Sequence, residues 1–274
     1  MFRVLMTLML STGLLASHAM ANEVNVSGST SVSRIMDVLA EDYNQTHPES
    51  YIAVQGIGST AGLTLVQKGV IDVAMTSRYL TEREQSENYT VAQLAFDGLT
   101  VVVNPANPVD DLTREQLYKI YKGQITNWKE LGGQDQTIAV VTREASSGTR
   151  YSFESLIGLT KVINDRSVSD INPNNLVVNS NSMVKTLVNH NKQAIGFIST
   201  GSVDRSVKAV TFEGVVGDND TIAKGQYALS RPFLLVYNPE KLTNDAKAFL
   251  EFLTSNQAQV LIEEYGYTPL PSEK

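Results

Sequence analysis

The sequence predicts an α/β protein with largely parallel sheets. Short β-branched runs alternate with amphipathic helical patterns along most of the chain, an order typical of a sheet covered by helices. The 274 residues are 42% hydrophobic and 19% charged, which excludes a disordered or coiled-coil chain and suffices for one large or two medium cores. The expected strands are residues 24–26, 52–54, 71–75, 100–103, 138–141 and 176–178.

Helices are expected between these strands because apolar residues recur there every three or four positions. The clearest examples are residues 32–43 and 183–188. Near the end of the chain the same spacing predicts one long helix around residues 245–265, and Pro269 and Pro271 follow it.

The first 21 residues have the features of a secretory signal peptide. Arg3 supplies a positive charge, residues 4–15 are mostly apolar, and Ala19-Met20-Ala21 has the small-x-small pattern that signal peptidase recognises. The chain has no cysteine, which excludes disulfides, thiolate nucleophiles, cysteine zinc sites and a lipid-anchoring cysteine. We therefore expect cleavage after Ala21 and an untethered periplasmic protein.

The rest of the chain is expected to form two lobes without a Gly/Ser-rich linker. Residues 99–104 and 227–238 are apolar and extended, so they could cross from one lobe to the other. We expect lobe 1 to comprise residues 22–99 and 231–274, and lobe 2 to comprise residues 100–230.

Clusters of Ser, Thr and Gly stand where expected strands pass into helices. The first turn of a helix has unpaired N–H groups and a positive dipole end, and glycine lets an anion come close. Any single cluster is explained by ordinary N-capping, but four at equivalent strand ends favour an anion site. Arg143, four residues before Ser147, would add a forked cation. The clusters are residues 27–31, 58–62, 76–77 and 146–149.

Motifs of enzymes, cofactor sites and nucleic-acid sites are weak or absent in the sequence. Residues 56–61 match the dinucleotide fingerprint, but they follow the second strand rather than the first. His47 and His190, the histidines outside the signal peptide, cannot readily form a metal cluster. With 22 basic and 29 acidic residues, the net charge of −7 gives no overall attraction to nucleic acid. We expect a protein that is not an enzyme and has no catalytic residue, metal or cofactor.

Five segments together resemble the periplasmic phosphate-binding proteins of the high-affinity phosphate ABC transporter, the PstS family. The fourth is the most diagnostic because it is long and rich in specific residues, including Trp128. The segments are GSTS at 28–31, QGIGSTAG at 55–62, GVIDVAMTSRYLTEREQ at 69–85, LTREQLYKIYKGQITNWKELGG at 112–133 and TREASSGTRYSFE at 142–154.

The fourth segment also has a purely structural interpretation. Thr113 and Gln116 are spaced as a capping box at the start of a helix, and Gly123 is placed to end it. Trp128 is expected to be a packing anchor for the turn that follows.

The resemblance, which covers essentially the whole chain after the signal peptide, implies a type II periplasmic binding protein. Such a protein has two α/β lobes joined by a hinge, with the ligand cleft between them. The implied function is capture of inorganic phosphate by a monomeric solute-binding protein, which delivers it to the inner-membrane permease of an ABC transporter.

The resemblance also implies which residues bind phosphate. The implied set is Thr30, Ser31, Ser59, Ser77, Arg143, Ser147, Gly148 and Thr149. Ser77 departs from the family, whose best-known members have an aspartate there that accepts the phosphate proton and repels sulfate. Glu144 and Asp72 are the candidate replacements, although Glu144 could instead orient Arg143 and Asp72 could cap its own loop.

Two alternatives stay open at this point. The uncharged Ser77 allows a receptor for another tetrahedral oxyanion, such as sulfate or molybdate. An exported serine hydrolase is the alternative from another class, but the sequence offers it no evident base. Arg78 is expected to pair with Glu82, four residues on, rather than to reach a ligand.

Overall fold

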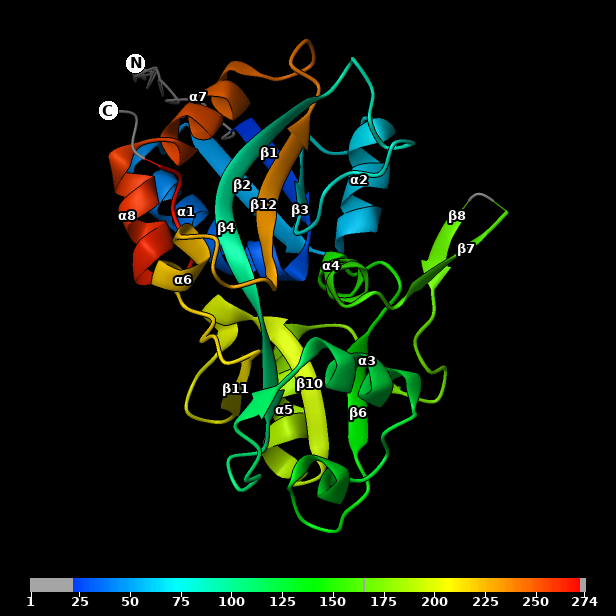
Figure 1. The fold of residues 1–274 in the computed structure, drawn as a ribbon. Helices are drawn as coiled ribbons and strands as arrows, with labels where there is room; N and C mark the ends of the chain where they lie inside the picture. Colours follow the sequence, from blue (N-terminus) through cyan, green and yellow to red (C-terminus); the bar gives the residue numbers. More distant parts are fainter. Residues whose placement is uncertain (1–21, 165, 272–274) are drawn as a thin grey trace, which may run out of the picture.

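The computed structural model describes residues 22–164 and 166–271 and has the expected α/β architecture (Figure 1). Two bodies of sheet and helix lie one above the other in this view, and the long strand β4 runs from one into the other. The predicted signal peptide lies outside the described residues. Among the residues that are described, no helix is both long and apolar enough to cross a membrane.

The elements alternate along the chain as the hydrophobic pattern predicts. The first group is β1 (Asn22–Gly28), α1 (Thr30–Thr46), β2 (Ser50–Gly56), α2 (Ser59–Gln67), β3 (Val73–Thr76) and β4 (Thr90–Val103). The middle group is β5 (Asp111–Leu112), α3 (Arg114–Lys122), the 3-10 helix Trp128–Leu131, β6 (Ala139–Arg143), α4 (Gly148–Ile157), β7 (Thr160–Ile163), β8 (Arg166–Ser169), β9 (Leu176–Val178), α5 (Asn181–His190) and β10 (Ala194–Ser199). The last group is the 3-10 helix Thr200–Ser202, β11 (Lys208–Phe212), α6 (Asn219–Ala223), β12 (Ser230–Tyr237), α7 (Asn244–Leu253) and α8 (Asn256–Glu264).

The main sheet is mixed rather than largely parallel. Its strand order is β2-β1-β3-β12-β4-β10-β6-β9, with β11 and β5 beside this path. Strand β1 is parallel to β2 and β3, and β6 is parallel to β10 and β9. The pairs of β12 with β3 and of β4 with β12, β10 and β11 are antiparallel. The mixture arises because the chain leaves lobe 1 along β4 and returns along β12 in the opposite direction.

Strand β4 connects the two lobes directly. Its first part, residues 90–98, pairs with β12, whereas residues 99–103 pair with β10 and β11. Figure 1 shows β4 beside β12 in the upper body and continuing into the lower one. Most residues of the two segments expected to cross, 99–104 and 227–238, belong to β4 and β12.

Buried apolar residues form separate clusters above and below this crossing. One cluster takes its members from residues 24–95 and from residues 233–267, so both ends of the chain contribute to it. A second cluster is built from residues 99–229. Each set of helices thus packs on its own part of the sheet and buries its own core.

Most of the expected local structure is present. Thr113 and Gln116 form the capping box of α3, and Gly123 ends that helix with φ of 74°, a left-handed conformation that suits glycine. Trp128 is fully buried, and its ring Nε1 donates a hydrogen bond to the Gln193 carbonyl at 2.9 Å. Trp128 is therefore a packing anchor, as the sequence predicts.

The long C-terminal helix expected over residues 245–265 is instead two helices. Helix α7 ends at Leu253, and the side chain of Ser255 accepts a hydrogen bond from the Ala258 N–H, which caps the start of α8. The apolar spacing continues through the break, so periodicity alone does not reveal it. The polar pair Thr254 and Ser255 is the local signal for the new helix start.

Candidate functional site

The predicted site residues lie where strands end and helices begin, at the junction of the two lobes. Ser29 caps α1 by accepting hydrogen bonds from the N–H groups of Ser31 and Val32. Gly58 precedes α2 with φ of 94°, and Ser147 caps α4 by accepting from the Arg150 N–H. The N-termini of α1, α2 and α4 therefore meet in one region, which in Figure 1 is the level at which α4 lies below α2.

Hydroxyl groups of the two lobes are in direct contact there. The hydroxyl oxygens of Ser31 on lobe 1 and Thr149 on lobe 2 are 2.8 Å apart. The Ser152 hydroxyl of lobe 2 donates to the Ser77 carbonyl of lobe 1 at 3.1 Å. All four residues are buried, so the structure is a closed form with little room for solvent between the loops.

Gly148 shows how closely the lobes approach. A Cβ atom at this position would lie 2.2 Å from the Ser59 hydroxyl oxygen and 2.7 Å from that of Ser77. Both distances are shorter than real Cβ contacts. Glycine is therefore required at the start of α4 for the lobes to close to this separation.

Arg143 is the central cation of the site and is only 1% exposed. Its Nη2 donates to the Thr30 hydroxyl across the cleft at 3.0 Å, and its Nη1 donates to Asn181 Oδ1 at 3.2 Å. Its Nε and Nη2 also bind the two carboxylate oxygens of Glu144 at 3.0 and 3.1 Å. This two-point contact fixes the plane of the guanidinium, so Glu144 orients Arg143.

Ser59 and Ser77 complete the lobe 1 side of the site. The Ser77 N–H donates to the Ser59 hydroxyl at 3.2 Å, and the Ser29 hydroxyl donates to that of Ser77 at 2.8 Å. Because its oxygen already accepts, the Ser77 hydroxyl has its own hydrogen free to donate. The structure thus brings all eight predicted residues together, with Ser147 acting also as a helix cap.

The two candidate proton acceptors lie in very different places. Asp72 precedes β3 and accepts a hydrogen bond from the Asn25 N–H at 2.8 Å, whereas Ser77 follows the opposite end of that strand. A four-residue strand spans about 13 Å, so Asp72 cannot reach the site. Glu144 remains near it, but both of its oxygens are already bound to Arg143.

A second buried ion pair, absent from the predicted set, contacts the site. Arg231 is 2% exposed, and its Nε and Nη2 donate to Asp97 Oδ2 at 3.0 and 2.8 Å. Its Nη1 donates to the Thr149 hydroxyl at 2.8 Å and to the Ser77 carbonyl at 3.2 Å. The sequence signal for these residues is a charge inside an apolar run, in LAFDGL at 94–99 and SRPFLLVY at 230–237.

Burial opposes the charges of this pair. Burial raises the pKa of Asp97 above its ordinary value, against the stabilising effect of Arg231 and of the hydrogen bond from Ser199. Burial also lowers the pKa of Arg231, an effect that Asp97 opposes and the nearby charge of Arg143 reinforces. Each arginine at the site thus has its own carboxylate partner, so the cluster is rich in donors without a large net charge.

Asn181 was also missed by the sequence analysis. It begins α5, and its Nδ2 donates to the Ser31 hydroxyl at 3.1 Å while its Oδ1 accepts from Arg143. The residue thus connects two predicted members of the site. Asn181 directly follows Ser180, the N-cap of α5, so in the sequence it indicates only the start of a helix.

Arg78 pairs with Glu84 rather than with Glu82. The two guanidinium Nη atoms each lie 2.7 Å from a carboxylate oxygen of Glu84, which also accepts from the Thr81 N–H. The spacing of four residues assumes a helix, but the chain forms turns here. Arg78 also donates to the Thr60 hydroxyl at 3.2 Å, so it braces α2 beside the site.

A surface cavity of about 450 Å³ opens beside the site. Thr30 and Asn181, which hydrogen-bond to Arg143 in the closed site, form part of its wall, and Arg34 and Lys185 lie around it. This cavity places solvent next to the lobe junction. The Thr30 end of the junction is therefore its solvent-facing end.

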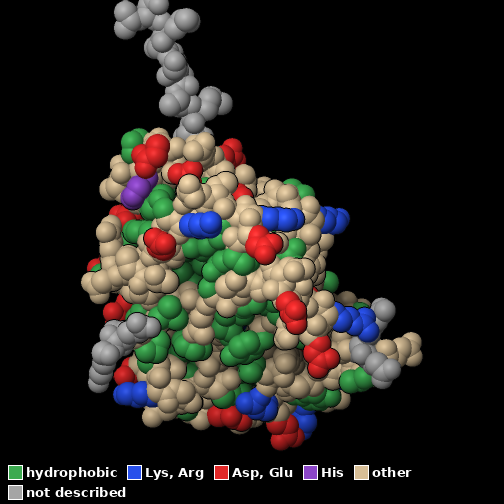
Figure 2. Space-filling model, turned by 90° about the horizontal axis from the view of Figure 1, so that it is seen from above, with side chains coloured by type: hydrophobic (Ala, Val, Ile, Leu, Met, Phe, Trp, Pro, Cys, Tyr) green, Lys and Arg blue, Asp and Glu red, His purple; other side chains and the backbone are tan. Residues whose placement is uncertain are grey.

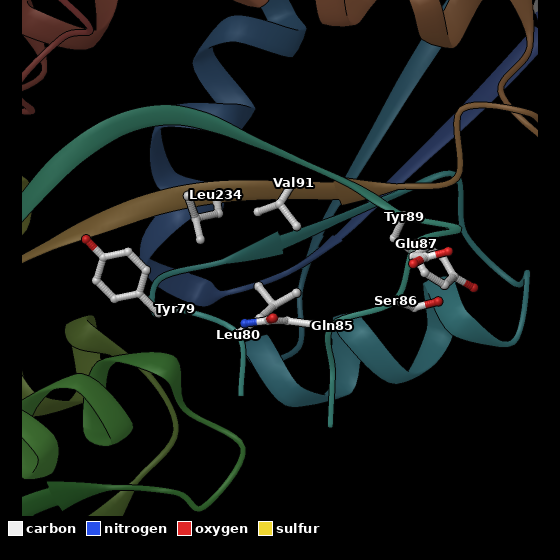
Figure 3. A pocket seen from close by; sticks show the side chains of 8 residues that line it. All are labelled: Tyr79, Leu80, Gln85, Ser86, Glu87, Tyr89, Val91 and Leu234. Atoms are coloured by element: carbon white, nitrogen blue, oxygen red, sulfur yellow. The ribbon is translucent and has the colours of Figure 1, made fainter. Parts of the chain in front are cut away.

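Another cavity, of about 590 Å³, lies away from the site on lobe 1 (Figure 3). Its lining is mainly apolar and aromatic, and Glu87 is its charged residue. Figure 3 shows Tyr79 and Tyr89 toward opposite ends of the groove, with Val91 and Leu234 between them. A cavity without a cation does not suit an oxyanion, so the lobe junction is the better candidate site.

Comparison with known proteins places the chain in a family. A model described as the PBP superfamily domain matches residues 16–257. The phosphate-binding protein PstS of Staphylococcus aureus (strain USA300) is 30% identical, over 92% of this chain and 79% of the relative. The crystal structure of an ABC-type phosphate transport receptor from Vibrio cholerae is 65% identical, with a TM-score of 0.77 over 90% of this chain and 100% of that one.

A crystal structure with bound phosphate, from Clostridium perfringens, is 37% identical, with a TM-score of 0.86 over 91% of this chain and 100% of that one. The relatives' names describe binding proteins and a transport receptor rather than enzymes, as the sequence analysis predicts. The protein thus belongs to the PBP superfamily and, within it, to the family of the phosphate-binding proteins PstS.

Proposed function

We propose that this protein captures inorganic phosphate between its two lobes and delivers it to the permease of an ABC transporter. The observation that carries the proposal is the convergence of buried donors from both lobes. Lobe 1 contributes hydroxyls and helix N-termini, and lobe 2 contributes Arg143 and the start of α4. An anion that binds both faces favours the closed form, which is the form that a permease would recognise.

The binding residues in this proposal are the predicted set: Thr30, Ser31, Ser59, Ser77, Arg143, Ser147, Gly148 and Thr149. The guanidinium of Arg143 provides charge, while hydroxyls and the first N–H groups of α1, α2 and α4 provide neutral donors. A chain with a net charge of −7 can therefore bind an anion, because the attraction is local and shielded from solvent.

We propose the lobe boundaries predicted from the sequence, with crossings near residues 99–100 and 230–231. Two observations support them. Strand β4 changes partners after residue 98, and the separate core clusters draw on residues 24–95 with 233–267 and on residues 99–229. Bending of β4 and β12 at this level would open and close the cleft.

Titration calorimetry of the purified protein with phosphate, sulfate and molybdate tests the ligand. We expect heat and tight binding with phosphate. Sulfate or molybdate is the second candidate, favoured by two observations: Ser77 is uncharged, and both oxygens of Glu144 are bound to Arg143. Tight sulfate binding with no response to phosphate would refute the proposal and establish that alternative.

The serine hydrolase alternative loses its support in this structure. His47 caps the C-terminal end of α1 and its ring Nδ1 lies 3.1 Å from the Tyr43 carbonyl oxygen. A 17-residue helix is about 25 Å long, so His47 is far from the serines at the opposite end. His190 lies at the last residue of α5, at the far end of that helix from Asn181 and the site. Neither histidine can serve as a base for Ser147.

We further propose that the protein is exported to the periplasm, cleaved after Ala21, and acts as a monomer that does not bind nucleic acid. The signal-peptide pattern supports export, and the mass of the mature protein recovered from periplasmic extract tests the cleavage point. On the face in Figure 2, Lys and Arg side chains are interspersed with Asp and Glu rather than gathered. The mixed charge of this face supports the proposal that the protein does not bind nucleic acid.

A further inference from the structure

The buried pair of Asp97 and Arg231 joins β4, which crosses between the lobes, to the start of β12, where the returning chain enters lobe 1. The two residues are direct partners in the antiparallel pairing of β4 with β12, so their side chains start from adjacent backbone positions. Arg231 uses two nitrogens on one carboxylate oxygen, at 2.8 and 3.0 Å. The other oxygen of Asp97 accepts from the hydroxyl of Ser199, at the end of β10 in lobe 2.

The third nitrogen of Arg231 contacts a binding loop of each lobe. Its Nη1 donates to the Thr149 hydroxyl of lobe 2 at 2.8 Å and to the Ser77 carbonyl of lobe 1 at 3.2 Å. Thr149 and Ser77 are both buried, and both belong to the proposed site. One guanidinium can make these contacts at the same time only when the lobes are closed.

The contact with Thr149 fixes the direction of a hydroxyl. A guanidinium nitrogen can only donate, so the Thr149 oxygen accepts and its own hydrogen must point elsewhere. The Ser31 hydroxyl oxygen likewise accepts a hydrogen bond, from Asn181 Nδ2 at 3.1 Å, so its hydrogen also points elsewhere. The two hydroxyl oxygens lie 2.8 Å apart across the cleft, so one of them donates to the other in this structure. An anion bound beside the pair would replace that contact and receive both hydrogens.

The geometry points to Arg231 as a positioning residue of the anion site. Held by Asp97, it turns the Thr149 hydroxyl into a donor for the bound anion and ties the hinge strands to the closed form. Breaking a buried ion pair is costly, and such pairs are retained in some proteins for structural specificity rather than stability. This inference rests on the proposed function, since the anion is the phosphate captured there.

A double-mutant cycle by titration calorimetry with phosphate tests the inference. Arg231→Lys keeps a positive charge beside Asp97 but loses the fork that also reaches Thr149. Thr149→Val removes the hydroxyl that Arg231 orients. We expect Arg231→Lys to raise the Kd at least about tenfold in the wild-type background and less than about threefold in the Thr149→Val background.

A neutral pair, Asp97→Asn with Arg231→Gln, provides a second variant that leaves no unpaired buried charge. We expect it to weaken phosphate binding similarly and to increase the radius of gyration of the ligand-free protein in small-angle scattering, because closure loses a contact. The matched control is Lys122→Gln with Asp170→Asn, an ion pair of 2.5 Å on lobe 2 outside the site, which should change neither result.

A Kd within about threefold of wild type in either folded variant would overturn the inference, as would an equal loss with and without the Thr149 hydroxyl. Wild-type protein that does not respond to phosphate would refute the proposed function itself, and with it this inference. Thermal unfolding of each variant distinguishes loss of binding from loss of folding.

Discussion

Replacing Gly148 with alanine should prevent the lobes from closing while leaving each lobe folded. The new Cβ would lie 2.2 Å from the Ser59 hydroxyl oxygen, about 0.8 Å inside the 3.0 Å limit for real Cβ contacts. Neither neighbouring serine can turn away freely, because Ser59 accepts from the Ser77 N–H and Ser77 accepts from Ser29. The two lobes must therefore stay nearly an ångström farther apart than in the closed structure.

A misplacement of about 1 Å at an active site can lower the reaction rate about 100-fold. We expect a loss of affinity of similar size, so the Kd for phosphate should rise about 100-fold, which corresponds to about 2.8 kcal/mol of binding free energy. Folding should be unaffected, because Gly148 begins α4 with a helical backbone that alanine favours. The assay is titration calorimetry with phosphate, together with thermal unfolding of the ligand-free protein.

Gly158→Ala is the matched control at the other end of the same helix. Gly158 has φ of 86° and a Cβ there would meet nothing within 4 Å, so alanine costs about 1 kcal/mol of stability without touching the cleft. We expect Gly158→Ala to lower the unfolding temperature and preserve the Kd, whereas Gly148→Ala should preserve the unfolding temperature and raise the Kd. Phosphate binding by Gly148→Ala within threefold of wild type would refute the reasoning.

Three further predictions use other groups. Arg143→Ala should raise the Kd for phosphate at least about 30-fold, since a buried charge contact costs about 2 kcal/mol or more to lose, and an unchanged Kd in calorimetry would remove Arg143 from the site. Ser77→Asp adds a buried carboxylate, so competition titrations should show sulfate binding weakened more than phosphate binding; equal losses would contradict this. Burial alone would raise the pKa of Glu84, but hydrogen bonds from Arg78 and Thr81 outweigh it and hold the pKa below its ordinary value. The resulting stability is present above the ordinary pKa and is lost as pH falls through the lowered one, so unfolding temperatures should fall less steeply below pH 5 in Glu84→Gln than in wild type.

The parts of the site that depend on local sequence could be predicted. A strand, a glycine and a run of hydroxyls before a helix form one continuous segment, so residues 28–31 and 146–149 indicate donors without knowledge of the rest of the fold. Their meeting in one cleft depends on the order of strands, which the alternating pattern predicts only in outline.

The errors arise where proximity depends on three-dimensional geometry rather than spacing. Asp72 and Ser77 are close in sequence, but an extended strand separates them and places Asp72 at its opposite end. Asp97 and Arg231 are 134 residues apart, and only the register of β4 against β12 brings them together. Single charges in apolar strands are the signal that such a pairing exists, but the partner cannot be identified until the strand order is known.

The contribution of both ends of the chain to one core has a consequence for the order of folding. Lobe 2 is continuous in sequence, so its core can form as soon as that segment is available. The core of lobe 1 includes Phe233, Phe249 and Tyr267, and it cannot form until nearly the whole chain is present. Because a domain tends to fold as a unit, the N-terminal strands can pack into the core of lobe 1 only after the last residues have been synthesised. During synthesis, the N-terminal part of the chain therefore stays without its folded core until nearly all residues have been added.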